Sequence, residues 1–299
     1  MTYSIVGADL EAGEVGCAVQ SKYFAVGAVV PWAKAGVGAV ATQAAGVAAY
    51  GVRVLEQLEA GVEPAEALRL VLADDEARET RQLGVVTADG RSASFTGSEC
   101  NDWAGDVQGA AFAAQGNILA GPEVVSDMER AFEKTDGPLA ERLMAAVEAA
   151  EAAGGDRRGR QSAAIVVERA GAGARSSEGI DRVVDLRVDD HPEPIEELRR
   201  LLGIHTGWGL AREAMAFYES KDFAGGIELM LGGLQRAPDT SGVLRYQLAC
   251  FESLAGRRHA AVEHLRAAIE AEPSWRADAR ADSDFDALRD DPGVQELLR

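Results

Sequence analysis

Hydrophobic and polar residues alternate over the first 43 positions in the manner of short β-strands. The alternation predicts strands over residues 3–8, 15–20 and 37–43, with a turn-rich connector at 9–14 between the first two. Helical spacing begins after that: Val52, Leu55 and Leu58 predict a helix over 49–60, and Pro64 opens a second one. The chain therefore begins with strands that are followed by a pair of helices.

The same order of elements is repeated in the following residues. The pattern predicts strands over 82–87 and 92–96, joined by an Asp-Gly turn at 89–90, and a further strand over 109–115. Two helices follow, one from about residue 121 and one over 138–153, and then strands over 161–168 and 183–188. Because strands and helices come in blocks, the pattern favours a layered α+β domain with antiparallel sheets between helix pairs.

Residues beyond the Pro-containing connector 191–194 follow helical spacing alone. Four pairs of residues superimpose at an interval of 35 positions: Ile227 and Val262, Met230 and Leu265, Leu234 and Ile269, and Pro238 and Pro273. This interval is close to the ~34-residue tetratricopeptide period, and the segment resembles such repeats. We therefore predict one domain over residues 1–204 and a tetratricopeptide-like helical module over 205–299.

The helical module is expected to need a neighbouring surface. Two repeats are fewer than the roughly three that make an array stable on its own. We expect the module to pack on the first domain or on a second copy of the chain, in a homodimer or a higher homo-oligomer. A groove that stays open on the module would suit a protein or peptide partner.

The charge balance narrows the classes of partner. The chain has 30 basic and 49 acidic residues, a net charge of −19. This acidic excess argues against nucleic acid and an anionic membrane surface, because both require clustered Lys and Arg. No apolar run reaches the ~20 residues of a membrane span, and the N-terminus lacks the basic segment of a signal peptide, so a cytoplasmic location is expected.

Metal and cofactor sites find little support in the sequence. Cys17, Cys100 and Cys250 are far apart without a CxxC pair, and His259 and His264 lie five residues apart, which does not place them on one helix face. The string Gly-x-Gly-x-x-Ala at 36–41 reads as a strand, and the acid that a dinucleotide site carries about 20 residues later is not set at a strand end here. We expect no metal and no cofactor, which leaves small-molecule and protein partners.

The N-terminus carries the strongest candidate chemistry. Initiator Met is normally removed when the next residue is small, and here that residue is Thr2, at the start of a predicted strand. Removal of Met1 would give one residue both a hydroxyl and a free α-amine, whose pKa near ~7.7–8.0 leaves a fraction able to accept the hydroxyl proton at pH 7. The hydroxyl could then attack an amide carbonyl. The alternative is that Thr2 has no catalytic part.

Segments spread over the first two thirds of the chain resemble the bacterial family called domain of unknown function 1028. The matching runs cover residues 2–6, 18–27, 29–33, 36–43, 115–119, 154–163 and 188–192, and the match spans about 1–205. That family is assigned to the N-terminal-nucleophile hydrolase superfamily. The resemblance therefore implies a four-layer αββα sandwich, which is an α+β fold, and a hydrolase whose nucleophile is Thr2.

The resemblance also implies catalytic roles beside Thr2. Ser21 and Lys22 stand where proteasome-like N-terminal-nucleophile hydrolases carry a small-polar-basic trio beside the nucleophile. Gln20 departs from that pattern, since those relatives have an acidic residue at this position. Lys22 either lowers the pKa of the α-amine by like-charge repulsion or is a surface residue at a strand end.

Three further residues are candidates for contact with a substrate, and Asn117 is a candidate for catalysis. Thr42 and Gln43 end a strand that should lie next to Thr2, so their polar groups either face the pocket or are satisfied at the strand end. Gly116 and Asn117 are expected at a strand-to-helix turn. A backbone N–H and the amide side chain of Asn117 would stabilise an oxyanion there, or the segment is a plain turn.

A loop at 156–161 concentrates charge in an otherwise acidic chain. Asp156, Arg157, Arg158 and Arg160 precede Gln161 at the start of a predicted strand. The arginines would suit a substrate carboxylate through bidentate contacts. The alternative is a solvated loop with internal ion pairs. For substrate binding we consider Asp156, Arg157, Arg160 and Gln161.

Two classes of function are consistent with these residues. The first is an amidohydrolase that cleaves the C–N bond of a small polar, anionic, amide or ureido compound, with Thr2 as nucleophile after removal of Met1. The second is a catalytically inactive scaffold whose helical tail mediates protein–protein interaction. The residue type of Thr2 favours the enzyme, because a scaffold would not require it.

Overall fold

The chain divides into two compact units in the computed structural model. The structure describes residues 2–173, 179–236, 239 and 241–299. The first unit is Met1–Arg199 and the second is Arg200–Arg299, so the division falls within one long helix, α5 (Pro194–Ser220). Among the described helices, none combines the length and the apolar character that crossing a bilayer requires.

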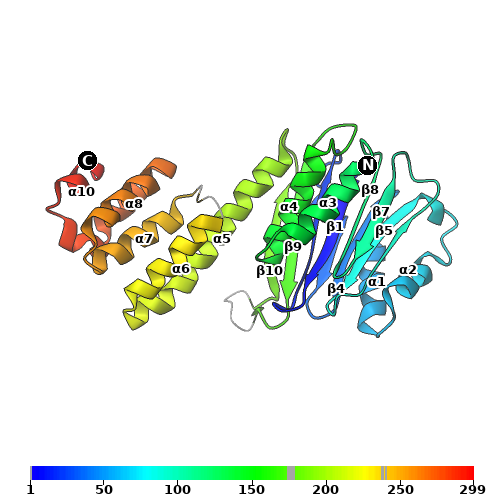
Figure 1. Ribbon diagram of the computed structural model, residues 1–299, viewed down its shortest axis with the longest axis horizontal. Helices are drawn as coiled ribbons and strands as arrows, with labels where there is room; N and C mark the ends of the chain where they lie inside the picture. The colour runs from blue at the N-terminus through cyan, green and yellow to red at the C-terminus, as the bar shows by residue number, and fades with distance from the viewer. Residues whose placement is uncertain (1, 174–178, 237–238, 240) are drawn as a thin grey trace. The chain divides into compact units, whose positions relative to one another are not determined.

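Two antiparallel sheets form the centre of the first unit (Figure 1). Sheet A has the strand order β10-β9-β2-β1-β8-β7, and sheet B has the order β3-β4-β5-β6. The strands of sheet A are β1 (Thr2–Asp9), β2 (Glu14–Ser21), β7 (Gly105–Gly109), β8 (Phe112–Asn117), β9 (Ser162–Arg169) and β10 (Arg182–Val188). Those of sheet B are β3 (Pro31–Lys34), β4 (Gly38–Ala44), β5 (Arg81–Thr87) and β6 (Ser92–Thr96). The expected mixed α+β class is confirmed.

Each sheet is covered on one face by a pair of helices (Figure 1). Helices α1 (Ala49–Glu59) and α2 (Pro64–Leu72) lie on sheet B, where Leu58 and Leu68 pack with Val40 of β4. Helices α3 (Glu123–Lys134) and α4 (Leu139–Ala152) lie on sheet A. A Cβ on Gly7 of β1 would lie only 2.8 Å from the Phe132 ring, so this glycine allows α3 to approach the sheet closely.

The other faces of the two sheets meet in a second apolar layer. Val6 and Val19 of sheet A pack with Ala41 and Val86 of sheet B in one buried cluster. Two 3₁₀ helices lie in connections of this unit: η1 (Val26–Ala28) is between β2 and β3, and η2 (Arg78–Thr80) is between α2 and β5. Burial of these small β-branched and Ala side chains on both faces of the central strands explains why the strands are so rich in apolar residues.

Two strands escape the sequence pattern. Strand β3 is four residues long and begins with Pro31, and β7 carries a Gly at each end and exposes every second residue. The strand expected over 109–115 is in fact the β7–β8 turn followed by β8, with Ala111 in the left-handed region at φ 65°. A turn without Gly, Asn or Pro gives no sequence signal, so the pattern predicts one strand where the structure has a hairpin.

The second unit is helical throughout its regular structure. After α5 come α6 (Phe223–Arg236), α7 (Val243–Leu254), α8 (Arg258–Ala271) and α9 (Trp275–Ala281), then the 3₁₀ helix η4 (Ser283–Leu288) and α10 (Pro292–Leu297). Helices α6 and α8 begin and end 35 residues apart, the interval read from the sequence. Pro238, one member of the repeated pairs, lies outside the described residues.

The apolar residues of the repeat are packed inside the second unit. Ile227 and Met230 pack with Phe251 of α7, whereas Leu265 and Ile269 pack with Phe285 of η4. Helices α5, α9 and α10 add packing surface beyond the two repeats recognised in the sequence. These side chains therefore do not require an external surface. The homo-oligomer stays a prediction.

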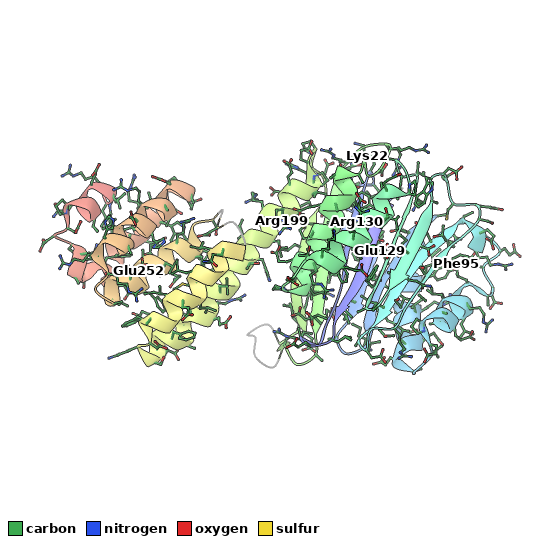
Figure 2. The ribbon with its side chains drawn as sticks, viewed as in Figure 1. Lys22, Phe95, Glu129, Arg130, Arg199 and Glu252 are labelled. Atoms are coloured by element: carbon green, nitrogen blue, oxygen red, sulfur yellow. The ribbon has the colours of Figure 1, made fainter. Side chains whose placement is uncertain are left out.

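A partly buried arginine, Arg199, fastens the start of α5 to α4 within the first unit (Figure 2). Arg199, with a quarter of its side chain exposed, donates two hydrogen bonds of 2.8 Å to Glu148 and a further one to Glu141. A bidentate pair between partly buried groups is among the stronger ionic contacts in proteins. Its loss would leave two carboxylates of α4 without their cation.

Replacement of Arg199 by Met is expected to lower the free energy of unfolding by about 2–3 kcal/mol, since both carboxylates lose a charge-assisted partner. Arg69→Met is the matched control, because Arg69 pairs with Glu66 at the exposed surface of α2. We expect that control to change stability by less than about 0.5 kcal/mol. Chemical denaturation of the three proteins measures both effects, and equal losses in the two variants would contradict the prediction.

Candidate active site

Four polar side chains form a row at one end of the four inner strands of sheet A. Thr2 is paired with Asn117 of β8, and Ser21 is paired with Ser162 of β9. The β1–β2 register, which pairs Tyr3 with Gln20, continues to place Thr2 opposite Ser21. Directly opposed residues of antiparallel strands project from the same face. Asn117, Thr2, Ser21 and Ser162 are therefore neighbours in one row, and all four are buried.

The nucleophile candidate and Ser21 are in direct contact. Thr2 Oγ1 lies 3.0 Å from Ser21 Oγ, which is a hydrogen bond between two buried hydroxyls. Thr2 and Val6 alternate onto the same face of β1, and Val6 belongs to the layer between the sheets, so the row faces sheet B. The structure thus brings together three residues that the sequence proposes as catalytic: Thr2, Ser21 and Asn117.

A network of buried amides connects this row to sheet B. Gln82 accepts hydrogen bonds at Oε1 from Gln43 Nε2 at 2.8 Å and from Asn117 Nδ2 at 2.9 Å. Its own Nε2 donates to Thr96 Oγ1 and to the carbonyl oxygens of Gly105 and Gly116. Gln43 also donates to the Thr2 carbonyl oxygen at 3.3 Å. These bonds fix the backbone and the neighbours of Thr2.

A second group of buried polar residues, Ser4, Gln43 and Gln115, is linked by hydrogen bonds that the sequence did not indicate. Ser4 donates to Gln43 Oε1 at 2.6 Å and accepts from Gln115 Nε2 at 2.6 Å. Gly84 makes room for this contact, because a Cβ there would lie 1.9 Å from Gln115 Oε1. The signal available in the sequence is a glutamine inside an otherwise apolar strand, at positions 82 and 115.

A cavity of about 190 Å³ opens beside Thr2. Thr42 and Gln43 of β4 are among the residues that line it. Their polar groups are engaged: Thr42 Oγ1 donates to the Val47 carbonyl oxygen at 3.2 Å, and Gln43 belongs to the amide network. The lining residues are Thr2, Tyr23, Val26, Val29, Val30, Thr42, Gln43, Ala44, Gly46 and Ala48.

Lys22 lies just beyond β2 and is exposed (Figure 2). Its ammonium donates to the Arg160 carbonyl oxygen at 2.9 Å, and its backbone N–H donates to Asp156 Oδ2 at 3.0 Å. Asp156 is buried and also accepts the Arg158 backbone N–H at 2.8 Å. Lys22 and Asp156 thus fasten the 156–161 loop to the end of the strand that carries Ser21.

The remaining loop residues make internal contacts. Arg160 forms ion pairs with Glu151 and Glu193, and Arg157 donates to the Asp102 carbonyl oxygen. Gln161 Nε2 donates to Asp190 Oδ1 at 3.1 Å. None of these loop residues is among those that line the cavity beside Thr2. For Arg160, the geometry favours the ion-paired alternative over contact with a substrate carboxylate.

Gly116 and Asn117 differ in setting from the expectation. They are the last two residues of β8, not a strand-to-helix turn, and Ile118 follows in the left-handed region at φ 53°. A Cβ on Gly116 would lie 2.4 Å from the Leu119 side chain, so the glycine provides space for that leucine. The expected turn is absent because β8 stays paired with β1 up to Asn117.

Gln20 and Cys17 lie on opposite faces of β2. Gln20 is opposite Tyr3 and projects from the face of sheet A away from Thr2, where its amide makes no hydrogen bond with the described residues. Gln20 is therefore not part of the row that contains Thr2. Burial raises the pKa of the Cys17 thiol well above its usual range, so Cys17 stays protonated and is no competing nucleophile.

Comparison with known proteins identifies the first unit. The model of a family of unknown function, DUF1028, matches residues 2–198. The chain belongs to this family. It is also similar to the crystal structure of a DUF1028 protein from Silicibacter pomeroyi, with 36% identity, a TM-score of 0.61 and coverage of 67% of this chain and 84% of that one. No curated protein matches the sequence.

Proposed function

We propose that this DUF1028 protein is an N-terminal-nucleophile amidohydrolase in which Thr2 is the nucleophile after removal of Met1. Met1 itself lies outside the described residues. The observation that carries the proposal is the placement of Thr2. This residue begins a central strand and lines a cavity, and its hydroxyl is hydrogen-bonded to Ser21 at 3.0 Å. The helix–sheet–sheet–helix order supports the αββα sandwich of that superfamily as the fold of this unit.

The proposed reaction uses the α-amine of Thr2 as the base. The amine accepts the hydroxyl proton while Oγ1 attacks the amide carbonyl carbon. When the tetrahedral oxyanion collapses, the C–N bond breaks and the leaving amine takes the proton from the ammonium. Water then attacks the Thr2 ester with the amine again as base, which breaks the ester bond and restores the hydroxyl. The products are a carboxylic acid and an amine.

The neighbours of Thr2 receive roles on this proposal. Ser21 orients the Thr2 hydroxyl through the bond of 3.0 Å. Asn117 Nδ2 carries two hydrogens, of which one is bonded to Gln82, so the other can stabilise the oxyanion. Lys22 is assigned to positioning, because its ammonium is bonded to the Arg160 carbonyl oxygen. Since Arg160 is paired with two carboxylates, the proposal no longer requires an anionic substrate.

The test combines intact mass with turnover. The purified protein is expected to lack one Met and to release ammonia from a panel of small primary amides and ureido compounds. The matched control is a chain with a Gly-Ser extension before Thr2, which keeps the hydroxyl and blocks the α-amine; we expect it to be inactive. Equal ammonia release by the extended chain would refute the mechanism. An inactive mature protein would favour the alternative, a scaffold whose tetratricopeptide-like tail binds a protein.

A further inference from the structure

The lining of the cavity beside Thr2 is neutral. Its walls combine apolar side chains such as Val26, Val29 and Val30 with uncharged polar groups, and none of the described residues that line it carries a charged side chain. The polar groups of Thr42 and Gln43 are engaged in internal hydrogen bonds. A carboxylate placed in such a cavity would lose its hydration without gaining a cationic partner.

The proposed chemistry adds a second reason against an anion. The α-amine of Thr2 has to be neutral in order to accept the hydroxyl proton. A carboxylate held beside it would favour the ammonium form and raise the pKa of the amine, which would reduce the fraction of active base at neutral pH. An apolar group in the cavity has no such effect, so a neutral substrate suits both the walls and the base.

The volume of the cavity and an exposed ring on its lining indicate which substrate group would fit. An apolar cavity of about 150 Å³ is known to hold benzene, so the cavity of about 190 Å³ accepts a group of that size or slightly larger. Tyr23 lines the cavity with 57% of its surface exposed, and the adjacent Phe24 is 62% exposed. An exposed tyrosine ring on the lining offers a flat apolar contact to a group that enters.

We infer that the cavity binds the acyl part of the substrate, and that this part is neutral, apolar and at most slightly larger than a benzene ring. This inference rests on the proposed function for the placement of the scissile bond at Thr2. Val29, which is half-buried on the cavity wall, is then a residue that determines specificity.

The experiment compares two amides of similar shape, 4-methylpentanamide and succinamate, in which an isopropyl group replaces a carboxylate. We expect the wild-type kcat/KM for the neutral amide to exceed that for succinamate by at least about 100-fold, in keeping with the cost of burying an unpaired charge. Binding is measured separately on Thr2→Ala by calorimetry, where the neutral amide should bind at least about 10-fold more tightly.

Two substitutions place the preference in the cavity. Val29→Asp should weaken binding of 4-methylpentanamide at least about 10-fold, because it puts a carboxylate on the wall. Val52→Asp is the control, since Val52 is exposed on α1 and is not part of the lining; it should leave binding unchanged. Thermal denaturation of both variants verifies that they are folded.

The outcomes separate the two proposals. Preference for the neutral amide in binding, without hydrolysis by the wild-type protein, would refute the hydrolase and keep the neutral cavity. Hydrolysis with equal or better use of succinamate would refute the neutral cavity and keep the hydrolase. Failure of both probes to bind Thr2→Ala, or an equal effect of the two Asp variants, would overturn the inference.

Discussion

Replacement of Thr2 by Ala is expected to abolish amide hydrolysis, with a loss of at least about 10³-fold in kcat, while the fold is retained. The hydroxyl is the attacking atom on the proposed mechanism, so its removal leaves no nucleophile at the cavity. The structural cost is small, because the variant loses one hydrogen bond to Ser21, about 1 kcal/mol. Ala at position 2 is also small, so Met1 should still be removed.

The control for this experiment lies two residues further along the same strand. Ser4→Ala removes the hydroxyl that bonds to both Gln43 and Gln115 and leaves their amides without a partner at that point. It should therefore lower the melting temperature more than Thr2→Ala does, yet keep kcat within about tenfold of wild type. If Ser4→Ala lost as much activity as Thr2→Ala, the loss would report damage to the site and not a missing nucleophile.

Local patterns were sufficient for the strands that are long and buried. Strands β1, β2, β4, β5 and β9 each carry a run of small apolar residues, and the predicted bounds agree with them to within two residues. Strands β3 and β7 could not be found in this way, because they are short and half-exposed. Their place in the sheets follows from pairing with β4 and β8, which is a property of the whole fold.

The site was only partly accessible to sequence reasoning. Thr2 was indicated by its place behind a removable Met1 and Ser21 by resemblance, and their 19-residue separation is spanned by the β1–β2 hairpin. The loop arginines illustrate the limit: Arg160 is paired with Glu193, which lies 33 residues away in the chain. The sequence shows that the arginines and carboxylates are present, but which of them pair depends on the tertiary structure.

The amide network of the buried glutamines could not be predicted for a related reason. Gln43 and Gln82 are directly opposite in the β4–β5 register, and each is buried. A glutamine at a strand end is usually solvated, so its type alone predicts exposure. Only the facing of the two sheets shows that Gln82 of sheet B also bonds to Asn117 of sheet A, the residue paired with Thr2.

Two fully buried glutamines give a sharp test of this network. Gln82 makes five hydrogen bonds through its side chain, whereas Gln20 makes none with the described residues. Gln82→Met should lower the free energy of unfolding by about 2–4 kcal/mol, because the amides of Gln43 and Asn117 lose their acceptor in a buried setting. The variant should also lose hydrolysis, since Asn117 is no longer held beside Thr2.

Gln20→Met is the matched control, with the same substitution at a position of equal burial. It removes an amide that lacks a partner, so stability should stay the same or rise by about 1 kcal/mol, and hydrolysis should be unchanged. Urea denaturation and the same amide assay on both variants provide the comparison. Equal destabilisation of the two variants would contradict this prediction, because the loss would then come from the poor fit of the Met side chain and not from the hydrogen bonds of Gln82.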